Sequence, residues 1–353
     1  MRIGIVAPPW LPVPPTSYGG IEAVVDGLAR GLSRLGHDVR LFTVAESTCP
    51  VRRFALFARG QDDMGLALPE AAHVIAAYDQ LRDCDVIHDH TLLGPLLGPV
   101  ANGVAGSDHP PVVVTHHNPF TPEAARVLGA VAGSATVVAV SHAHARSAHG
   151  VPIGAVVHHG VDLQRYHPRA AGDDGYLLFL GRMSPDKGVH RAVHVAARAG
   201  RRLVIASKMR HPDEVAYYER EVAPLLPRDA EPPREATMAQ AAALLAGASA
   251  LINPIAWPEP FGMVMIEALA SGTPVIASPH GAAPEIVEHG RTGFLCGDED
   301  AMVDAVRRIG AIDRRDCRTA AERRFSRERM ARDYLGLYLR LRRTSERRPA
   351  LVP

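Results

Sequence analysis

The sequence predicts an α/β protein that contains two doubly wound parallel sheets. Short apolar runs alternate with helix-compatible segments, as they do in the strand–helix–strand units of such sheets. The alternation begins at Ile3, is interrupted by the polar, proline-containing stretch 165–174, and restarts at Tyr176. The 353 residues, 47% of them hydrophobic and 22% charged, are enough for two domains with sizeable cores. We therefore expect two similar halves joined by a linker.

The composition excludes several classes of protein. A net charge of +1 gives no overall attraction to nucleic acid, so no nucleic-acid partner is expected. The cysteines show no C-x-x-C spacing and suit a reducing compartment. The N-terminal apolar run is too short for a signal peptide, and no segment reaches transmembrane length. We expect a cytoplasmic protein without an integral membrane segment. The basic tail 343–353 leaves a peripheral membrane contact open, but a solvated end is favoured.

The first half begins with a strand over 3–7 that Pro8 and Pro9 end, followed by a loop and a helix over 21–35. The helix has one apolar face, and Gly36 ends it. Gly19 and Gly20 lie in the loop between strand and helix. They either let a ligand approach the backbone or simply allow the chain to turn. Further strands are expected over 39–44, 86–88, 112–115 and 135–140.

Histidines follow three of these strands, at His90, at His116 and His117, and at His142. Because the carboxyl ends of parallel strands share one edge of a sheet, these rings are expected at the ligand-facing edge. A metal site is one interpretation. The simpler interpretation is that these are polar residues at strand ends that border a cleft, because no set of histidines and carboxylates here has a recognised metal-motif spacing. Asp83 and Asp85 precede their strand and are expected on the surface.

The second half repeats the pattern. Strands are expected over 176–180, 203–206, 250–254 and 274–277, with a further turn and strand over 290–296. The stretch 227–237 is charged, rich in proline and weakly structured. Helices are expected over 189–199, 213–225, 238–248, 263–270, 298–310, 314–325 and 327–342, and a short one opens at Glu285.

The loop Gly181–Gly188 follows the first strand of this half. It is not a P-loop, because Asp186 stands where that motif needs glycine. Arg182 and Lys187 flank the turn, and two cations at a strand's carboxyl end suit a diphosphate. Taken alone, they could also be solvated surface cations.

The stretch Trp257–Glu285 combines a loop, a helix N-terminus and a strand. Glu259 and Glu267 lie eight positions apart across the Pro260–Gly262 corner. Unpaired N–H groups at a helix N-terminus bind anions, while carboxylates bind hydroxyl groups. Phosphate together with hydroxyls indicates a nucleotide, a sugar phosphate or both.

The motifs, taken in order, resemble those of the retaining GT-B glycosyltransferases of family 4, also called glycosyl transferases group 1. The resemblance covers nearly the whole chain. Single motifs are weak, but their order and spacing are specific. They are Gly19-Gly20-Ile21-Glu22, Gly36-His37-Asp38-Val39, Gly160-Val161-Asp162, Gly181-Arg182 with Lys187-Gly188, Glu259-Pro260-Phe261-Gly262 with Glu267, Ser271–Val275, Glu285, and Gly290 with Gly293-Phe294.

The resemblance implies two Rossmann-like domains that face each other across a cleft. Residues 1–168, with a C-terminal crossing helix over about 327–353, would bind the acceptor. Residues 169–326 would bind the donor, a nucleoside-diphosphate sugar of hexose type. No cofactor and no metal are implied. The base of the donor (UDP, GDP, TDP or ADP), the acceptor and the oligomeric state stay open.

The resemblance also assigns roles to single residues. Arg182 and Lys187 would hold the diphosphate, and Glu267 would bind the ribose hydroxyls. Glu259 and His117 would contact the transferred sugar. Whether the transfer proceeds by front-side attack or by double displacement stays open. These four residues, His117, Glu259, Arg182 and Lys187, form the expected catalytic set. The remaining donor contacts would come from Gly19 and Gly20, which close over the phosphates, and from the backbone N–H groups of Phe261, Gly262, Met263 and Val264.

Three positions depart from the family pattern. Ser207–Arg210 replaces a glycine-rich turn, so Lys208 could contact phosphate or be a surface cation. His159 stands where asparagine is common, and 227–237 lacks the usual form of the base-binding region. Two rival functions are weighed against sugar transfer. One is a nucleotide-sugar 2-epimerase of related fold, and the other is a non-catalytic nucleotide-sugar-binding protein.

Overall fold

The computed structural model describes residues 1–16, 19–61, 64–101, 109–169, 173–228 and 230–346. Residues 347–353 of the predicted basic tail, which include Arg347 and Arg348, lie outside the described residues, whereas residues 343–346 end the last helix. The chain forms two compact units, Met1–Gly160 with Arg327–Pro353, and Val161–Ser326. The division falls after Gly160, whereas the sequence suggested a boundary after Pro168. Each unit contains a parallel sheet with helices packed on it, which confirms the α/β fold class.

The sheet of the first unit has the strand order β3-β2-β1-β4-β5-β6-β7, and every neighbouring pair is parallel. The five strands predicted in this half are present. The outermost strands, β3 and β7, were not predicted. The strands are β1 (Arg2–Val6), β2 (Asp38–Thr43), β3 (Arg52–Ala55), β4 (Val86–Asp89), β5 (Val112–Thr115), β6 (Ala135–Ala139) and β7 (Ile153–Val156).

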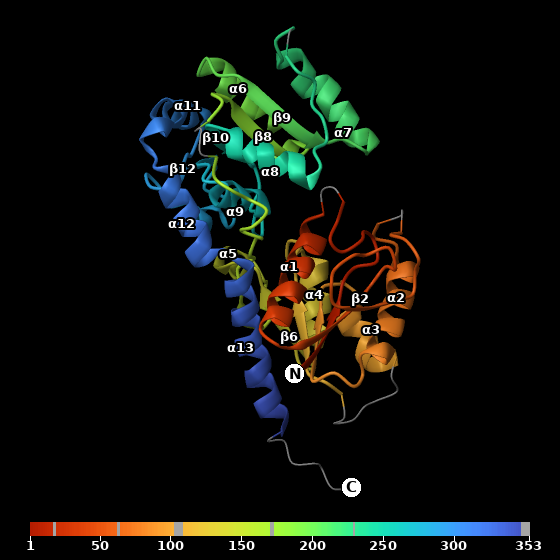
Figure 1. Ribbon diagram of the computed structural model, residues 1–353. Coiled ribbons are helices and arrows are strands. Elements are labelled where there is room, and N and C mark those ends of the chain that lie inside the picture. The colour runs from red at the N-terminus through yellow and green to blue at the C-terminus, as the bar shows by residue number, and fades with distance from the viewer. Residues whose placement is uncertain (17–18, 62–63, 102–108, 170–172, 229, 347–353) are drawn as a thin grey trace, which may run out of the picture. The chain divides into compact units, whose positions relative to one another are not determined.

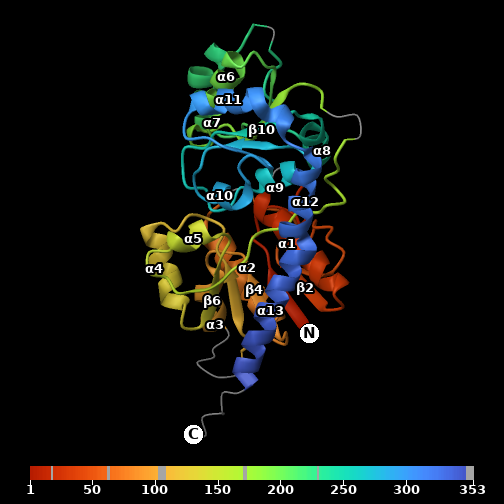
Figure 2. The same cartoon turned by 90° about the vertical axis from the view of Figure 1, so that its left-hand side faces the viewer.

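The helices of this unit pack against its sheet. They are α1 (Gly20–Arg34), α2 (Ala67–Gln80), α3 (Gly94–Ala101), α4 (Pro122–Val131), α5 (His142–Arg146) and α13 (Arg327–Glu346). The last helix, although far away in sequence, packs along α1 (Figures 1 and 2). A Cβ atom added to Gly31 would lie 2.7 Å from the Cβ of Ala331. The two helices therefore meet where α1 has no side chain.

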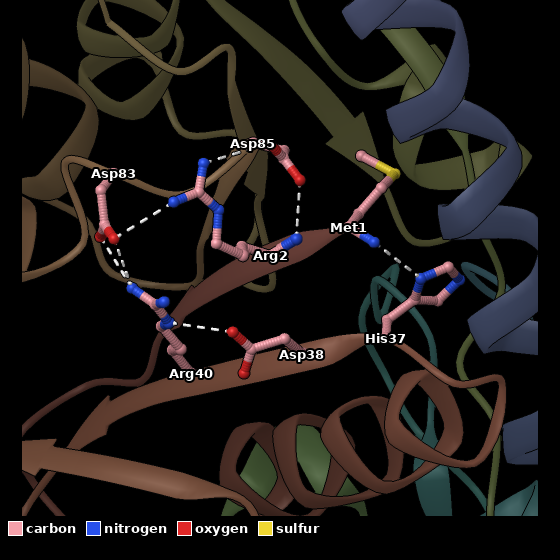
Figure 3. A network of polar contacts seen from close by, with 7 residues as sticks. All are labelled: Met1, Arg2, His37, Asp38, Arg40, Asp83 and Asp85. Atoms are coloured by element: carbon pink, nitrogen blue, oxygen red, sulfur yellow. Dashed lines mark hydrogen bonds and ion pairs between the residues drawn. The ribbon is translucent and has the colours of Figure 1, made fainter.

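A network of ion pairs joins the amino ends of three strands of the first sheet (Figure 3). Asp83 accepts hydrogen bonds from Arg40 at 2.7 Å and from Arg2 at 3.4 Å. The backbone N–H of Arg2 donates to Asp85 at 2.7 Å. The network confirms that Asp83 and Asp85 lie at the surface edge that precedes their strand. They link the amino ends of β1 and β2 to the segment that precedes β4.

The sheet of the second unit has the order β12-β11-β10-β8-β9, again parallel throughout. Its strands are β8 (Leu177–Arg182), β9 (Leu203–Lys208), β10 (Ala250–Asn253), β11 (Val275–Ala277) and β12 (Gly293–Leu295). Its helices are α6 (Val189–Arg198), α7 (Pro212–Tyr217), α8 (Met238–Gly247), α9 (Met263–Ala270), α10 (Ala283–Ile286), α11 (Glu299–Arg308) and α12 (Arg314–Arg324). Apart from the segment 213–225, the elements predicted in this half are present in the predicted order.

The segment 213–225 was predicted as one helix, and the structure divides it. α7 ends at Tyr217, a π-helical turn spans Tyr218–Val222, and a short 3-10 turn follows over Ala223–Leu225. Pro224 lacks a backbone N–H, which prevents a regular α-helix from continuing there. The next stretch, 227–237, contains no regular strand among its described residues. Its Arg234 carbonyl accepts a hydrogen bond from the Ser207 N–H at 3.0 Å, so this stretch borders β9.

Candidate functional site

Two loops meet at the carboxyl edge of the second sheet. One follows β8 and contains Lys187; the other follows β10 and contains Glu259. The Ala256 N–H donates to the Asp186 carbonyl at 2.9 Å. Gly188 adopts a left-handed conformation with φ of 70°, and a Cβ there would lie 2.3 Å from the Pro254 carbonyl oxygen. Only glycine allows both the conformation and this close approach.

The two loops bring Lys187 and Glu259 together as an ion pair, although they are 72 positions apart in sequence. The pair is largely buried, with side-chain exposures of 11% for Lys187 and 13% for Glu259. The Lys187 ammonium also lies 5.6 Å from the ring centre of Trp257, within reach of a cation–π interaction. A cation held in a partly dehydrated setting attracts anions more strongly than one in open water.

The helix α9 begins beside this ion pair. Gly262 is its N-terminal flanking residue, with φ of 96°, and no side chain in the described part of the chain caps the helix there. The N–H groups of a first helical turn have no partner within the helix, and the helix dipole makes this end positive. A Cβ on Gly262 would lie 3.4 Å from Oε2 of Glu259. The Glu259 carboxylate therefore lies beside Gly262, where α9 begins.

Several buried polar atoms at this edge have no hydrogen-bond partner within the described part of the chain. Buried polar groups are normally paired, and each unpaired one costs about 1–3 kcal/mol. A polar ligand that reached these atoms would recover part of that cost. The atoms are Ser184 Oγ, Asn253 Nδ2, Trp257 Nε1, Glu259 Oε2 and Ser278 Oγ.

Arg182 ends β8 and lies less buried than Lys187. Its side chain is 44% exposed, and its guanidinium lies 3.4 Å from the Asp186 carboxylate. The β8–β9 register pairs Arg182 with Lys208, so the end of the neighbouring strand carries a second cation. Lys187 and Lys208 are the two lysines of the whole sequence. Both lie at this one edge, while the remaining cationic side chains are arginines.

Glu267 lies in the second turn of α9. The hydroxyl group of Tyr166 donates a hydrogen bond to its carboxylate. Burial raises the pKa of Glu267 to about 7, and the Tyr166 hydrogen bond and the nearby Arg165 charge oppose that rise. Glu267 is therefore a carboxyl group that changes charge near neutral pH.

The other predicted residues belong to the first unit. Gly19 is the N-terminal flanking residue of α1, and Gly20 is its first residue. His117 follows β5, so these three residues share the carboxyl edge of the first sheet. Nε2 of His117 lies 2.9 Å from Nδ1 of the buried His90, and its ring centre lies 5.1 Å from that of His159. Burial holds the pKa of His117 well below its usual range, so the ring is neutral at pH 7.

Sequence reasoning missed several residues of these edges. Asn253 and Ser278 follow apolar strands directly, and the rule that polar strand ends face ligands would have found them. Tyr166 carries no such signal, and although the place of His90 at the edge was predicted, its contact with His117 was not. Their contacts depend on how distant segments pack.

In the described residues, no three His, Cys, Asp or Glu side chains are grouped so that they could hold a metal ion. Nor does any helix described here have the length and apolar character to cross a membrane.

Both halves of the chain match family models of glycosyltransferases. Residues 18–165 match the family model described as Glycosyltransferase Family 4. Residues 174–311 match the one described as Glycosyl transferases group 1. The glycine loop and His117 fall in the first match, and the ion pair and α9 fall in the second.

Similar proteins span nearly the whole chain. A glycogen synthase of Mycobacterium tuberculosis is 28% identical over 387 aligned residues, which cover 91% of this chain and 89% of that protein. The structure of AviGT4, a glycosyltransferase involved in avilamycin A biosynthesis, is 27% identical with a TM-score of 0.75, covering 97% of this chain and 98% of its own. HepE of Anabaena in complex with UDP-glucose is 19% identical with a TM-score of 0.74, covering 96% and 100%. The chain therefore belongs to the glycosyltransferases of the GT-B fold, with a family 4 domain followed by a group 1 domain.

Proposed function

We propose that this glycosyltransferase moves a hexose from a nucleoside-diphosphate sugar to an acceptor, with retention of anomeric configuration and without a metal ion. The observation that carries the proposal is the Lys187–Glu259 pair beside the uncapped N-terminus of α9. It combines a dehydrated cation, backbone donors and a carboxylate at one sheet edge. That is the chemistry needed for a diphosphate attached to a sugar.

The charge that develops on the leaving group is the main demand of the reaction. Cleavage of the bond between the anomeric carbon and phosphate leaves an anionic nucleoside diphosphate and a sugar with oxocarbenium character. Lys187, Arg182 and the first-turn N–H groups of α9 would stabilise that anion, so the protein itself supplies the positive charge. Removing one preorganised donor of this kind typically costs about 2.7–4 kcal/mol of transition-state stabilisation.

The hydroxyl-bearing parts of the donor would be held by carboxylates. Glu267 would accept hydrogen bonds from the ribose, and Glu259 would accept them from the sugar through Oε2, which has no partner among the described residues. Gly19 and Gly20 would close over the phosphates, and His117 would contact the transferred sugar. The similar fold of HepE was solved in complex with UDP-glucose, which supports a hexose donor.

The ion pair also bears on how configuration is retained. In double displacement, Glu259 would attack the anomeric carbon. A carboxylate paired with Lys187 is a weakened nucleophile, because the cation stabilises its negative charge. The pairing therefore supports front-side attack, in which the leaving phosphate takes the acceptor's proton and Glu259 positions the sugar.

The test is to incubate the protein with a panel of UDP-, GDP-, TDP- and ADP-sugars, with and without candidate acceptors. We expect release of nucleoside diphosphate that depends on acceptor, a product whose anomeric configuration matches that of the donor by NMR, and full activity in the presence of EDTA. A new sugar isomer without acceptor would instead indicate epimerisation, and binding without turnover would indicate a non-catalytic protein. An inverted product or inhibition by EDTA would contradict those parts of the proposal.

A further inference from the structure

The carboxyl edge of the first sheet carries histidines at the ends of four neighbouring strands. They follow or end β4, β5, β6 and β7, which lie in this order in the sheet. Most have partners that fix them in place. The residues are His88 and His90, His116 and His117, His142 and His144, and His158 and His159. One pair, His90 and His117, has the geometry of a direct hydrogen bond between two imidazoles.

His90 itself stands on a rigid base. Its ring centre lies 4.1 Å from that of His88, which is fully buried in β4. Both nitrogens of His88 are engaged. Nε2 lies 2.7 Å from the Thr115 hydroxyl, and Nδ1 lies 2.7 Å from the hydroxyl of Tyr338 on α13. The hydroxyl of Tyr334, one turn earlier on α13, lies 2.8 Å from the same Thr115 oxygen. The C-terminal helix thus fixes the ring against which His90 packs.

The contact between the two rings suits a hydrogen bond. Nδ1 of His90 lies 2.9 Å from Nε2 of His117, and the ring planes differ by 29°. A neutral imidazole carries one N–H donor and one acceptor nitrogen, so one ring must donate and the other accept. His90 is 3% exposed and is therefore withdrawn from solvent, whereas His117 is only partly buried. Of the two, His117 is the ring that can reach a ligand.

The second nitrogen of His90 decides the direction of the bond. Its Nε2 is buried and has no hydrogen-bond partner within the described residues. If the proton were on Nε2, an N–H would be buried without an acceptor. If the proton is on Nδ1, only the lone pair of Nε2 lacks a partner. Buried N–H groups without an acceptor are rarer in proteins than buried lone pairs without a donor. The favoured arrangement has His90 donating from Nδ1 to Nε2 of His117.

We propose that His90 is a positioning residue that holds His117 in the tautomer with its proton on Nδ1. His117 then presents an N–H donor to a hydroxyl oxygen of the transferred sugar. It is neutral and has one orientation, because His90 holds one side of the ring and His159 packs against it. The contact with sugar rests on the proposed function, while the tautomer and the His90–His117 bond do not.

NMR tests the tautomer without any substrate. Two-bond ¹H–¹⁵N correlations of the histidine rings distinguish nitrogen that carries a proton from nitrogen that does not, and the His117 signals are identified by their loss in His117→Gln. We expect the protonated nitrogen of His117 to be Nδ1 in the wild-type protein and in His90→Asn, whose amide nitrogen can replace Nδ1 as donor. In His90→Leu we expect a mixture of tautomers. A wild-type His117 protonated on Nε2 overturns the proposal.

Kinetics test the consequence for catalysis. We expect kcat/KM to fall about 10- to 100-fold in His90→Leu, the loss typical of removing the hydrogen-bond partner behind a metal-bound histidine, and to stay near the wild-type value in His90→Asn, which keeps an N–H donor. His73→Asn is the matched control, because His73 is equally buried but bonds the Ala7 carbonyl at 3.0 Å. Wild-type kcat/KM in His90→Leu, or equal losses in folded His90→Asn and His90→Leu, contradict the positioning role. If no variant and no wild-type sample transfers sugar, the proposed function fails, and the NMR result still decides the His90–His117 bond.

Discussion

Lys187 is the residue on which the donor site depends most. We expect Lys187→Met to lower kcat/KM about 10²- to 10³-fold, because one preorganised positive donor to the leaving group is lost. Arg202→Met is a matched control, since Arg202 is an exposed cation of the same unit that pairs with Glu231. Steady-state rates with the identified donor provide the measurement. Unchanged kcat/KM in the Lys187 variant would remove this residue from the site.

The same substitution should also affect stability, because it leaves the Glu259 carboxylate buried without its cation. We expect Lys187→Met to lower the free energy of unfolding by about 1–3 kcal/mol. Adding Glu259→Gln should restore much of that loss, since the amide carries no charge. Urea unfolding of the two single variants and the double variant yields the coupling between the residues. Additive effects would show that the ion pair does not hold the two loops together.

We expect the affinity for the donor to depend on pH through the Glu267 carboxyl group. Its pKa is raised to about 7 by burial, and the carboxylate form is the one that can accept two hydrogen bonds from ribose. Affinity for a nucleoside-diphosphate sugar should therefore rise as pH increases through 7. Tyr166→Phe removes a hydrogen bond that favours the carboxylate, so the midpoint should move to higher pH. Calorimetry from pH 6 to 8.5 measures both curves, and identical midpoints would contradict the Tyr166–Glu267 link.

At the scale of elements, the packing of α13 on α1 depends on Gly31. A Cβ at this position would lie 2.7 Å from the Ala331 Cβ and 3.3 Å from the Arg327 carbonyl. We expect Gly31→Val to cost about 1–3 kcal/mol of stability through overpacking. Gly129→Ala in α4 is the control, because a Cβ there meets no described atom within 4 Å, and it should stabilise the chain by about 0.5–1 kcal/mol. Thermal unfolding tests both, and a Gly31→Val variant as stable as wild type would contradict the close contact.

The sequence predicted the second unit better than the first. Strands such as Ala250–Asn253 and Val275–Ala277 are short apolar runs between clear turn residues, which periodicity detects well. By contrast, β3 begins with the exposed Arg52 and Arg53, and α3 contains both prolines and glycines within its apolar sequence. Neither has the pattern of its class. Their structure depends on packing, of β3 against β2 at the edge of the sheet and of α3 against α2 and α4.

The candidate site shows the same division. Lys187 and Glu259 lie in loops that follow the neighbouring parallel strands β8 and β10, so the strand order brings the two loops together. The sequence assigned both residues to the donor only through the family resemblance. Their direct pairing, the Tyr166 contact with Glu267 and the His90 contact with His117 depend on side-chain orientation. No local sequence pattern specifies that. Sequence can therefore indicate which edge holds the site, but not how its side chains are paired.

At the scale of the whole molecule, buried neutral histidines make the first unit sensitive to acid. Burial lowers the pKa of His73 and of His144 to about 4 and that of His159 to about 3. The pKa values of four others are also lowered by burial: His88, His90, His116 and His117. In the unfolded chain these histidines titrate near 6.5, so below that pH the unfolded state binds more protons.

Stability should therefore fall as pH drops from 7 toward 4, by up to about 1.4 kcal/mol per pH unit for each histidine that stays neutral in the fold. Asp89 and Glu267 oppose this trend, because their pKa values are raised to about 6 and about 7 and the folded state holds their protons, but the buried histidines outnumber these two groups. Urea unfolding at pH 7.5, 6 and 5 measures the slope, and His144→Asn should reduce it. Equal stability at pH 7.5 and 5 would contradict the neutral state of these buried histidines.

Recognition of a diphosphate is the central feature of the proposed donor site, and binding measurements can test it directly. Calorimetric titration of the wild-type protein and Lys187→Met with a nucleoside diphosphate and with its monophosphate separates that recognition from binding of the nucleoside. We expect the wild-type protein to bind the diphosphate at least about tenfold more tightly, about 1.4 kcal/mol, and the Lys187 variant to lose that difference. Equal affinity of the wild-type protein for the two nucleotides, or a preference that survives in Lys187→Met, would contradict a diphosphate site at Lys187.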